Sequence, residues 1–147
     1  MNETVQVLRS VHDGDPKEDL MKAFKEVAEK TTVLGPLCLV AIYQRPDKVK
    51  TTSGVSLYIP DTSKAEDKWQ GKVGLLLKMG PLAFKEDETH QWGGVTPKVG
   101  DWVLFPIYST FPVDAAGKPV NGVNYTRVRF VEDVKITAVI EEPDIYY

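Results

Sequence analysis

The pattern of apolar residues changes abruptly at Gly35-Pro36, and this change constrains the fold more than any other feature. Before it, residues 16–30 repeat apolar side chains at helical spacing; after it, short runs rich in Val, Ile, Leu, Phe and Tyr are bounded by Gly and Pro. The first pattern predicts a helix and the second predicts strands. We therefore expect a mainly β protein of 147 residues, with an N-terminal extension over residues 1–34 and a β domain over residues 35–147.

The expected helix, at about residues 16–30, has clear start signals. Asp15 is placed to cap the first free backbone amides, Pro16 suits the first helical position, and Glu18 lies at the capping-box position. One stripe of this amphipathic helix is apolar and consists of Leu20, Met21, Phe24, Val27 and Ala28. Two interpretations stay open: the stripe covers the β domain, or it contacts a neighbouring subunit through Leu20, Phe24 and Val27.

Six runs predict strands, at residues 37–44, 55–59, 72–79, 102–106, 125–131 and 134–140. In the last run Val134, Ile136, Ala138 and Ile140 share one face, which is typical of a strand with one side on a core. The other runs carry apolar residues on both faces, which predicts closure into a barrel or burial against other subunits. Long polar connections are expected to carry function, at residues 45–54 with 60–71, at 80–100 and at 107–124.

The chain offers few groups suited to catalysis or metal binding. His12 and His90 lie in no ligand spacing, and the acidic run at residues 86–88 lacks the alternation of a calcium loop, so it predicts a solvated hairpin. Cys38 lies in an apolar run, which predicts a buried thiol. Glu132-Asp133 is interpreted as a pair of solvated turn carboxylates. We expect a protein that is not an enzyme and that has no cofactor and no metal.

Charge and hydropathy limit the classes of partner that the chain is expected to bind. The formal net charge is -3 and the charges are scattered, so the concentrated basic surface that nucleic acid requires is not expected. No run reaches the roughly 20 apolar residues that span a bilayer. The first residues lack the basic start and apolar stretch of a signal peptide, so we expect a cytoplasmic protein.

Five motifs follow one another from Gly35 onward. They are Gly35-Pro36-Leu37-Cys38-Leu39-Val40-Ala41-Ile42, Thr52-Ser53-Gly54-Val55-Ser56-Leu57, residues 70–80, Lys98-Val99-Gly100-Asp101-Trp102-Val103-Leu104-Phe105, and Val131-Glu132-Asp133-Val134-Lys135-Ile136. From about residue 36 to residue 147, their order resembles the GroES-type co-chaperonin family, whose members form rings of small β-barrels that cap a chaperonin. The resemblance implies a GroES-like, partly open β-barrel with long loops that forms a homo-oligomer and assists protein folding.

The resemblance also implies a partner-binding site. Residues 52–57 are similar to the mobile loop that docks on a chaperonin ring, and the candidate contact residues are Gly54, Val55, Ser56, Leu57 and Ile59. On an extended segment Val55 and Leu57 project to the same side as two apolar contacts. The alternative is that Val55, Leu57 and Ile59 are core residues of an ordinary β-hairpin. Residues 80–97 are expected to form the roof of the folding chamber.

Some features depart from the family pattern. Ser56 places a hydroxyl where the family usually has an aliphatic residue, and residues 1–34 and 107–124 have no family counterpart. The final strand is shortened, which leaves Ile145, Tyr146 and Tyr147 as candidate subunit contacts. These departures favour a second hypothesis, a phage virion structural protein that reuses the barrel as a capsid decoration or connector subunit and binds capsid or neck proteins. Such a protein is expected in the host cytoplasm or the virion.

Overall fold

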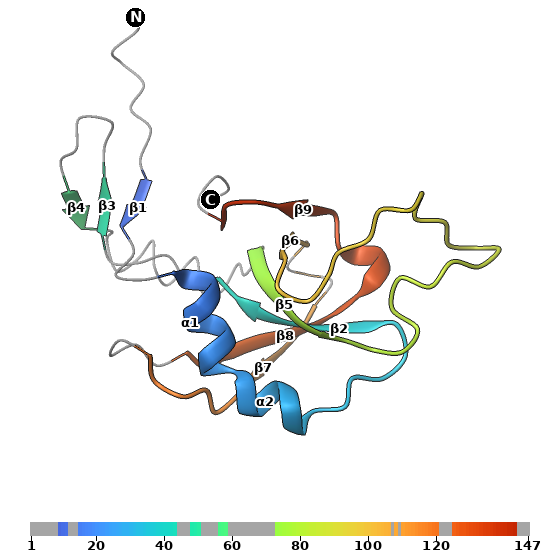
Figure 1. Cartoon of the computed structure of the whole chain (residues 1–147), viewed down its shortest axis with the longest axis horizontal. Coiled ribbons are helices and arrows are strands. Elements are labelled where there is room, and N and C mark those ends of the chain that lie inside the picture. Colours follow the sequence, from blue (N-terminus) through green and yellow to red (C-terminus); the bar gives the residue numbers. More distant parts are fainter. Residues whose placement is uncertain are drawn as a thin grey trace, which may run out of the picture.

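The computed structural model describes residues 9–11, 15–43, 48–50, 56–58, 73–106, 108, 110–120 and 125–143. Its main element is a six-stranded antiparallel sheet with the strand order β7-β8-β2-β5-β6-β9 (Figure 1). The strands are β2 (Leu37–Ile42), β5 (Val73–Met79), β6 (Trp102–Leu104), β7 (Thr110–Asp114), β8 (Arg127–Glu132) and β9 (Ala138–Ile140). The mainly β class is therefore confirmed.

A second, three-stranded antiparallel sheet contains β1 (Arg9–Val11), β3 (Lys48–Lys50) and β4 (Ser56–Tyr58). Strand β3 lies in the centre and pairs with both neighbours. This small sheet shares no strand with the six-stranded sheet.

The predicted helix is present, with a break. Helix α1 (Pro16–Ala23) begins where its cap predicts, because the Asp15 carboxylate accepts a hydrogen bond of 3.0 Å from the Lys17 amide. Helix α2 (Lys25–Lys30) follows after Phe24, whose backbone leaves the helical conformation at ψ 14°. The break divides the predicted helix into two short ones without changing which face is apolar.

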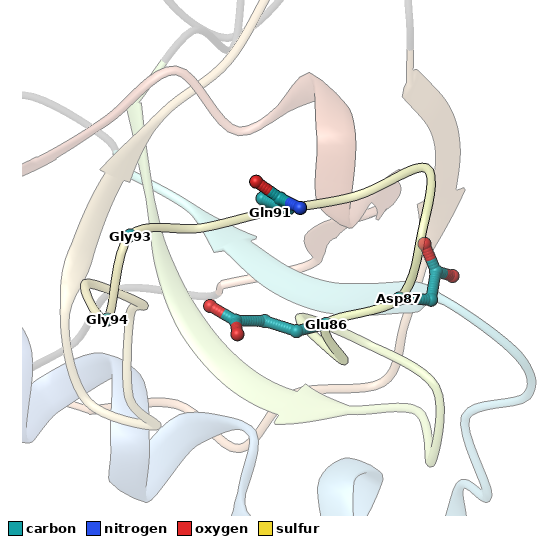
Figure 2. A pocket seen from close by; sticks show the side chains of 5 residues that line it. All are labelled: Glu86, Asp87, Gln91, Gly93 and Gly94. Atoms are coloured by element: carbon teal, nitrogen blue, oxygen red, sulfur yellow. The ribbon is translucent and has the colours of Figure 1, made fainter.

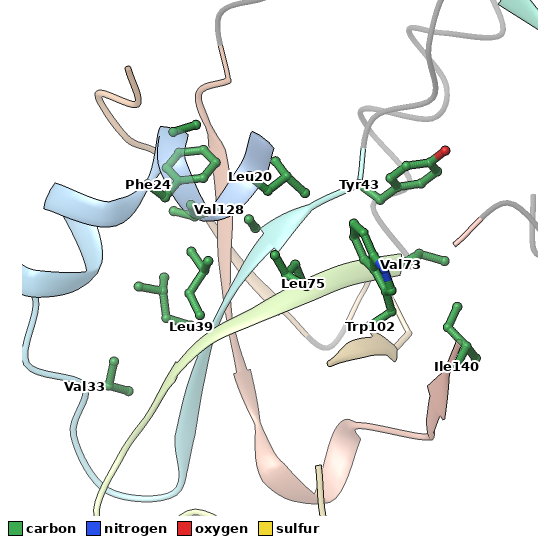
Figure 3. Close-up of a cluster of buried hydrophobic side chains, with 13 residues drawn as sticks. Leu20, Phe24, Val33, Leu39, Tyr43, Val73, Leu75, Trp102, Val128 and Ile140 are labelled. Atoms are coloured by element: carbon green, nitrogen blue, oxygen red, sulfur yellow. The ribbon is translucent and has the colours of Figure 1, made fainter. Parts of the chain in front are cut away.

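Alternate residues of the central strand β2 enter two separate hydrophobic clusters. Leu39 and Ala41 belong to the first cluster, in which Leu20 and Phe24 of the helical segment also pack (Figure 3). Cys38 and Val40 belong to the second cluster, on the opposite face of the sheet. Both faces of the sheet are thus buried within one chain, and the first cluster joins the predicted N-terminal extension to the β domain.

Two connections between strands cover the face of the sheet that carries the second cluster. Ala83 and Phe84, which follow β5, and Ile136, which follows the 3-10 helix η2 (Asp133–Lys135), pack against the second cluster. Burial on both faces therefore requires neither closure of the sheet nor a neighbouring subunit. Among the described residues no pairing joins β7 to β9, so the sheet is open. The GroES-like barrel remains a prediction.

Three sequence-based expectations about strands were wrong. Residues 45–54, expected to be a polar connection, contain β3. Residues 134–140 do not form one strand, because η2 occupies residues 133–135 and Val134 is exposed; only residues 138–140 pair, with β6. The stretch of residues 107–124, expected to be a loop, contains β7. Pro112 within that run argues against a central strand, but β7 lies at the edge of the sheet, where proline is tolerated.

Candidate partner-binding site

The predicted contact segment lies on the small sheet. Ser56 and Leu57 belong to β4, where Leu57 pairs with Val49 and Ser56 pairs with Lys50 of β3. Gly54, Val55 and Ile59 lie outside the described residues. The described part of the mobile-loop motif, residues 56 and 57, therefore lies on β4, which pairs antiparallel with β3. We call β3 and β4 together the β-hairpin arm; neither is a strand of the six-stranded sheet.

The apolar stripe of the helix faces the chain's own sheet through Leu20, Phe24 and Val27, whereas Met21 of the same stripe is 37% exposed. Leu20 is 2% exposed and Phe24 is 1% exposed, and both belong to the first hydrophobic cluster, against which half-buried Val27 also packs. The first of the two interpretations describes this arrangement, because Leu20 and Phe24 have almost no surface left for a neighbouring subunit. The other interface candidates, Ile145, Tyr146 and Tyr147, lie outside the described residues.

The stretch of residues 107–124, which has no family counterpart, holds the helical segment in place. The Lys118 amide donates a hydrogen bond of 2.8 Å to the carbonyl of Ala23, at the end of α1. Gly117 lies so close to Tyr125 and Phe24 that a β-carbon at this position would be 2.3 Å from the Tyr125 carbonyl oxygen and 3.0 Å from the Phe24 ring. The described part of this stretch is therefore a packing element for the helix.

Residues 80–97, predicted to form a roof, begin as a cover of the second cluster and then leave the sheet as an exposed loop. Phe84 marks the change, with a positive φ of 58° that non-glycine residues seldom adopt. Its amide donates a hydrogen bond of 2.9 Å to Asp133 Oδ2. The other carboxylate oxygen of Asp133 accepts a hydrogen bond of 2.7 Å from the Val134 amide.

The expectation of a solvated Glu132-Asp133 pair is wrong for Asp133, which is only 6% exposed, and holds for Glu132, which is exposed. Sequence reasoning missed Asp133 as an anchor. No local signal distinguishes it from Glu132, because the amide that it holds in place belongs to Phe84, 49 residues away.

The exposed loop carries an open pocket lined by Glu86, Asp87, Gln91, Gly93 and Gly94 (Figure 2). Asp87 Oδ1 accepts hydrogen bonds from the amides of His90, at 2.7 Å, and Thr89, at 2.8 Å. These two bonds, first that of His90, lower the pKa of the Asp87 carboxyl below its ordinary value. Asp87 is thus engaged in shaping the turn, as expected of an acidic hairpin.

Aromatic side chains support this loop from within. Trp92 contacts the edge of Phe84, with ring centroids 4.9 Å apart, and stacks with His90 at 6.4 Å. The Trp92 indole also donates a hydrogen bond of 3.2 Å to the Lys85 carbonyl. The loop is a folded structure built on its own aromatic residues.

Reactive groups are scarce in the described part of the chain. Cys38 is 0% exposed, and burial, with a smaller contribution from the charge of Asp133, raises the pKa of its thiol to about 12. A thiol with such a pKa is almost entirely protonated at neutral pH and is a poor nucleophile. No group of three or more His, Cys, Asp or Glu side chains within the described ranges is placed to hold a metal ion.

No described helix has both the length and the apolar character needed to cross a membrane. Comparison with models of protein families gives no match for this chain. A search of curated proteins likewise finds no match.

Proposed function

We propose that this chain is a co-chaperonin-like protein that docks its β-hairpin arm on a chaperonin ring, caps the folding chamber and assists protein folding in the cytoplasm. The observation that carries the proposal is the position of β4. This strand holds Ser56 and Leu57 of the mobile-loop motif, and it pairs within a small sheet that is separate from the six-stranded sheet. A segment outside the main sheet can engage a partner without unpairing that sheet.

The β-hairpin arm also lowers the entropy cost of binding. Fixing the backbone of one residue costs roughly 1–2 kcal/mol, so a fully disordered loop loses much of its contact energy when it binds. Pairing of residues 48–50 with residues 56–58 fixes part of that backbone before the partner arrives. A few apolar contacts from one arm still bind weakly, and several arms on one oligomer supply avidity while allowing release.

We further propose that residues 35–147 form a GroES-like, partly open β-barrel, and the strands of the six-stranded sheet support this. The motifs that resemble the family coincide with strands of this sheet: the first motif contains β2, the motif at residues 70–80 contains β5, and the motif at residues 98–105 contains β6. These three strands are neighbours in the order β2-β5-β6. In this proposal the oligomer brings several such domains together into a cap.

The test is nucleotide-dependent co-sedimentation of the full chain with a purified chaperonin. Leu57→Asp should abolish co-sedimentation, because a charge replaces an apolar contact on the hairpin arm. The matched control is Leu34→Asp, which makes the same change at a leucine that is 70% exposed in the turn before β2. Thermal unfolding of both variants should match the parent chain.

Unchanged binding by Leu57→Asp would reject the hairpin as the contact. Equal loss with both variants would show that the assay does not report a specific site. An absence of nucleotide-dependent binding by the parent chain to every chaperonin tried would reject the function itself.

A second candidate, a virion structural subunit, is favoured by the edges of the six-stranded sheet. Edge strand β7 exposes Phe111 by 67% and edge strand β9 exposes Val139 by 48%. An open strand edge offers backbone groups with which a strand of another protein can pair. Quantitative mass spectrometry of purified phage particles decides between the candidates: a stoichiometric amount of this chain supports the virion protein, and its absence rejects it.

A further inference from the structure

The two edges of the six-stranded sheet differ in their ability to accept another strand. Figure 1 shows β7 and β9 at opposite ends of the sheet, and among the described residues each pairs on one side only, β7 with β8 and β9 with β6. An unpaired strand edge presents a row of backbone donors and acceptors that another strand can use.

Strand β7 is blocked by Pro112. The Ala115 amide donates to the Thr126 carbonyl at 2.6 Å, in the same register as the β7–β8 pairs, and this bond sets the phase of the ladder. The backbone N–H and C=O groups of successive residues point to opposite sides of a strand. The backbone groups of residues 111 and 113 therefore face β8, and those of residues 110, 112 and 114 face the outer edge. Proline has no amide hydrogen, so a donor is missing at the middle of the outer edge of β7.

Strand β9 has no such block. The Leu76 amide donates to the Asp101 carbonyl at 2.9 Å, so the backbone groups of residues 101 and 103 face β5 and those of residues 102 and 104 face β9. Ala138 and Ile140, which pair with Leu104 and Trp102, therefore direct their backbone groups toward β6, and Val139 directs its amide and carbonyl outward. The side chain of Val139, the outward-facing residue, is also 48% exposed on its face of the sheet. The middle of the outer edge thus carries a backbone donor in β9, at Val139, and lacks one in β7, at Pro112.

The charges next to β9 specify the partner. Lys135 precedes the strand, Glu141 and Glu142 follow it, and all three side chains are exposed. Antiparallel pairing with a second copy places Lys135 of each chain near the acidic end of the other chain. Parallel pairing would place like charges side by side, which is unfavourable.

We propose that β9 is a self-association edge, at which two copies of this chain pair their β9 strands antiparallel about a two-fold axis centred on Val139. The two six-stranded sheets then become continuous. The contact is isologous, so it closes after two copies. Three paired residues make a small interface, and self-association is therefore weak and concentration-dependent. This inference does not depend on the chaperonin proposal.

Disulfide trapping of full-length Val139→Cys tests the arrangement. In a two-fold pair, residue 139 lies opposite its own copy, and opposed Cα atoms in antiparallel strands are about 4.5–5.5 Å apart, within the range of a disulfide. Cys38 does not compete, because it is 0% exposed. Under mild oxidation Val139→Cys should form a covalent dimer whose yield rises with protein concentration.

Phe111→Cys is the matched control, since it places a thiol at an exposed apolar position on the blocked edge, β7. It should give at least a ten-fold lower dimer yield. Equal yields from the two variants, or no dimer from Val139→Cys, would overturn the proposal.

Charge reversal tests the orientation of the strands. In sedimentation velocity, Lys135→Glu should weaken self-association several-fold, because two attractive contacts become repulsive. The double variant Lys135→Glu with Glu142→Lys should restore it, since the opposite charges are exchanged. A single reversal without effect, or a loss that the double variant does not restore, would overturn antiparallel pairing of β9.

Discussion

The Asp133 carboxylate and the Phe84 amide form a hydrogen bond of 2.9 Å that ties the 3-10 helix after β8 to the connection after β5. Phe84 is the only non-glycine residue with positive φ in the described part of the chain. Asp133 is 6% exposed, so this bond is made largely out of contact with water. The geometry at Phe84 is therefore held by a buried charge, and the cover of the second hydrophobic cluster depends on it.

Asp133→Asn should destabilise the protein by about 1–3 kcal/mol, because the amide group has one acceptor oxygen in place of two and leaves one of the two backbone amides without its partner. Urea unfolding measures the change. Asp114→Asn, at an exposed position on β7, is the control and should change stability by less than about 0.5 kcal/mol. Equal effects of both substitutions would show that Asp133 is not an anchor.

Gly80→Ala should be strongly destabilising. A β-carbon at this position would lie 2.2 Å from the Gly35 carbonyl oxygen, a backbone atom that cannot move without shifting the turn before β2. We expect a loss of about 3 kcal/mol in the free energy of unfolding. Gly94→Ala is the comparison: this residue has φ 79° but open space around it, so only backbone strain of about 1 kcal/mol is expected. A smaller loss for Gly80→Ala than for Gly94→Ala would contradict the close packing.

Lys78→Met should loosen the end of the helical segment. The Lys78 ammonium group donates hydrogen bonds to the carbonyls of Ala28, at 2.9 Å, and Thr31, at 2.7 Å, at the end of α2. The Ala28 carbonyl also accepts a longer bond of 3.4 Å from the Thr31 amide. Methionine keeps the length of the side chain and removes the donors, so we expect a loss of about 1–3 kcal/mol.

The control for Lys78 is Lys118→Met. Its ammonium group lies 4.0 Å from Glu26 at an exposed site, where ion pairs contribute little. Hydrogen exchange of the amides in residues 25–31 should accelerate in Lys78→Met and stay unchanged in Lys118→Met. Unchanged exchange in both variants would show that the Lys78 hydrogen bonds do not hold the end of α2.

The Cys38 thiol should make stability fall at alkaline pH. Its pKa is about 12 in the folded chain, above the ordinary value of 9.0, so the unfolded chain loses this proton first. The stabilising contribution is complete below pH 9.0 and is lost as the pH rises toward 12. The slope approaches about 1.4 kcal/mol per pH unit for one proton.

Comparison of the parent chain with Cys38→Ala isolates this effect, because other titrating groups contribute equally to both. The difference in free energy of unfolding should be constant up to about pH 8 and should then shrink toward about pH 10.5. A difference that stays constant over this range would mean that the folded thiol titrates like an unfolded one.

Local signals account for the parts of the fold that were predicted correctly. The cap at Asp15 and the proline at position 16 act within one helical turn, and the apolar runs of β2 and β5 are long enough to indicate buried strands. The break at Phe24 and the strand β7 have no comparable local signal. The break depends on the packing of the Phe24 ring in the first hydrophobic cluster. Strand β7 depends on its position at the edge of the sheet, where Pro112 is tolerated.

The amino-acid sequence by itself determined where the helical segment starts, which central segments are strands, and that Cys38 is buried, because each depends on neighbours within a few residues. Tertiary structure alone decided that the sheet is open, that Asp133 is an anchor, and that residues 133–140 split between a 3-10 helix and a short strand. The physical reason is distance along the chain. The partner of Asp133 and the neighbours of each strand in the sheet are segments far away in sequence, and a local pattern carries no record of them.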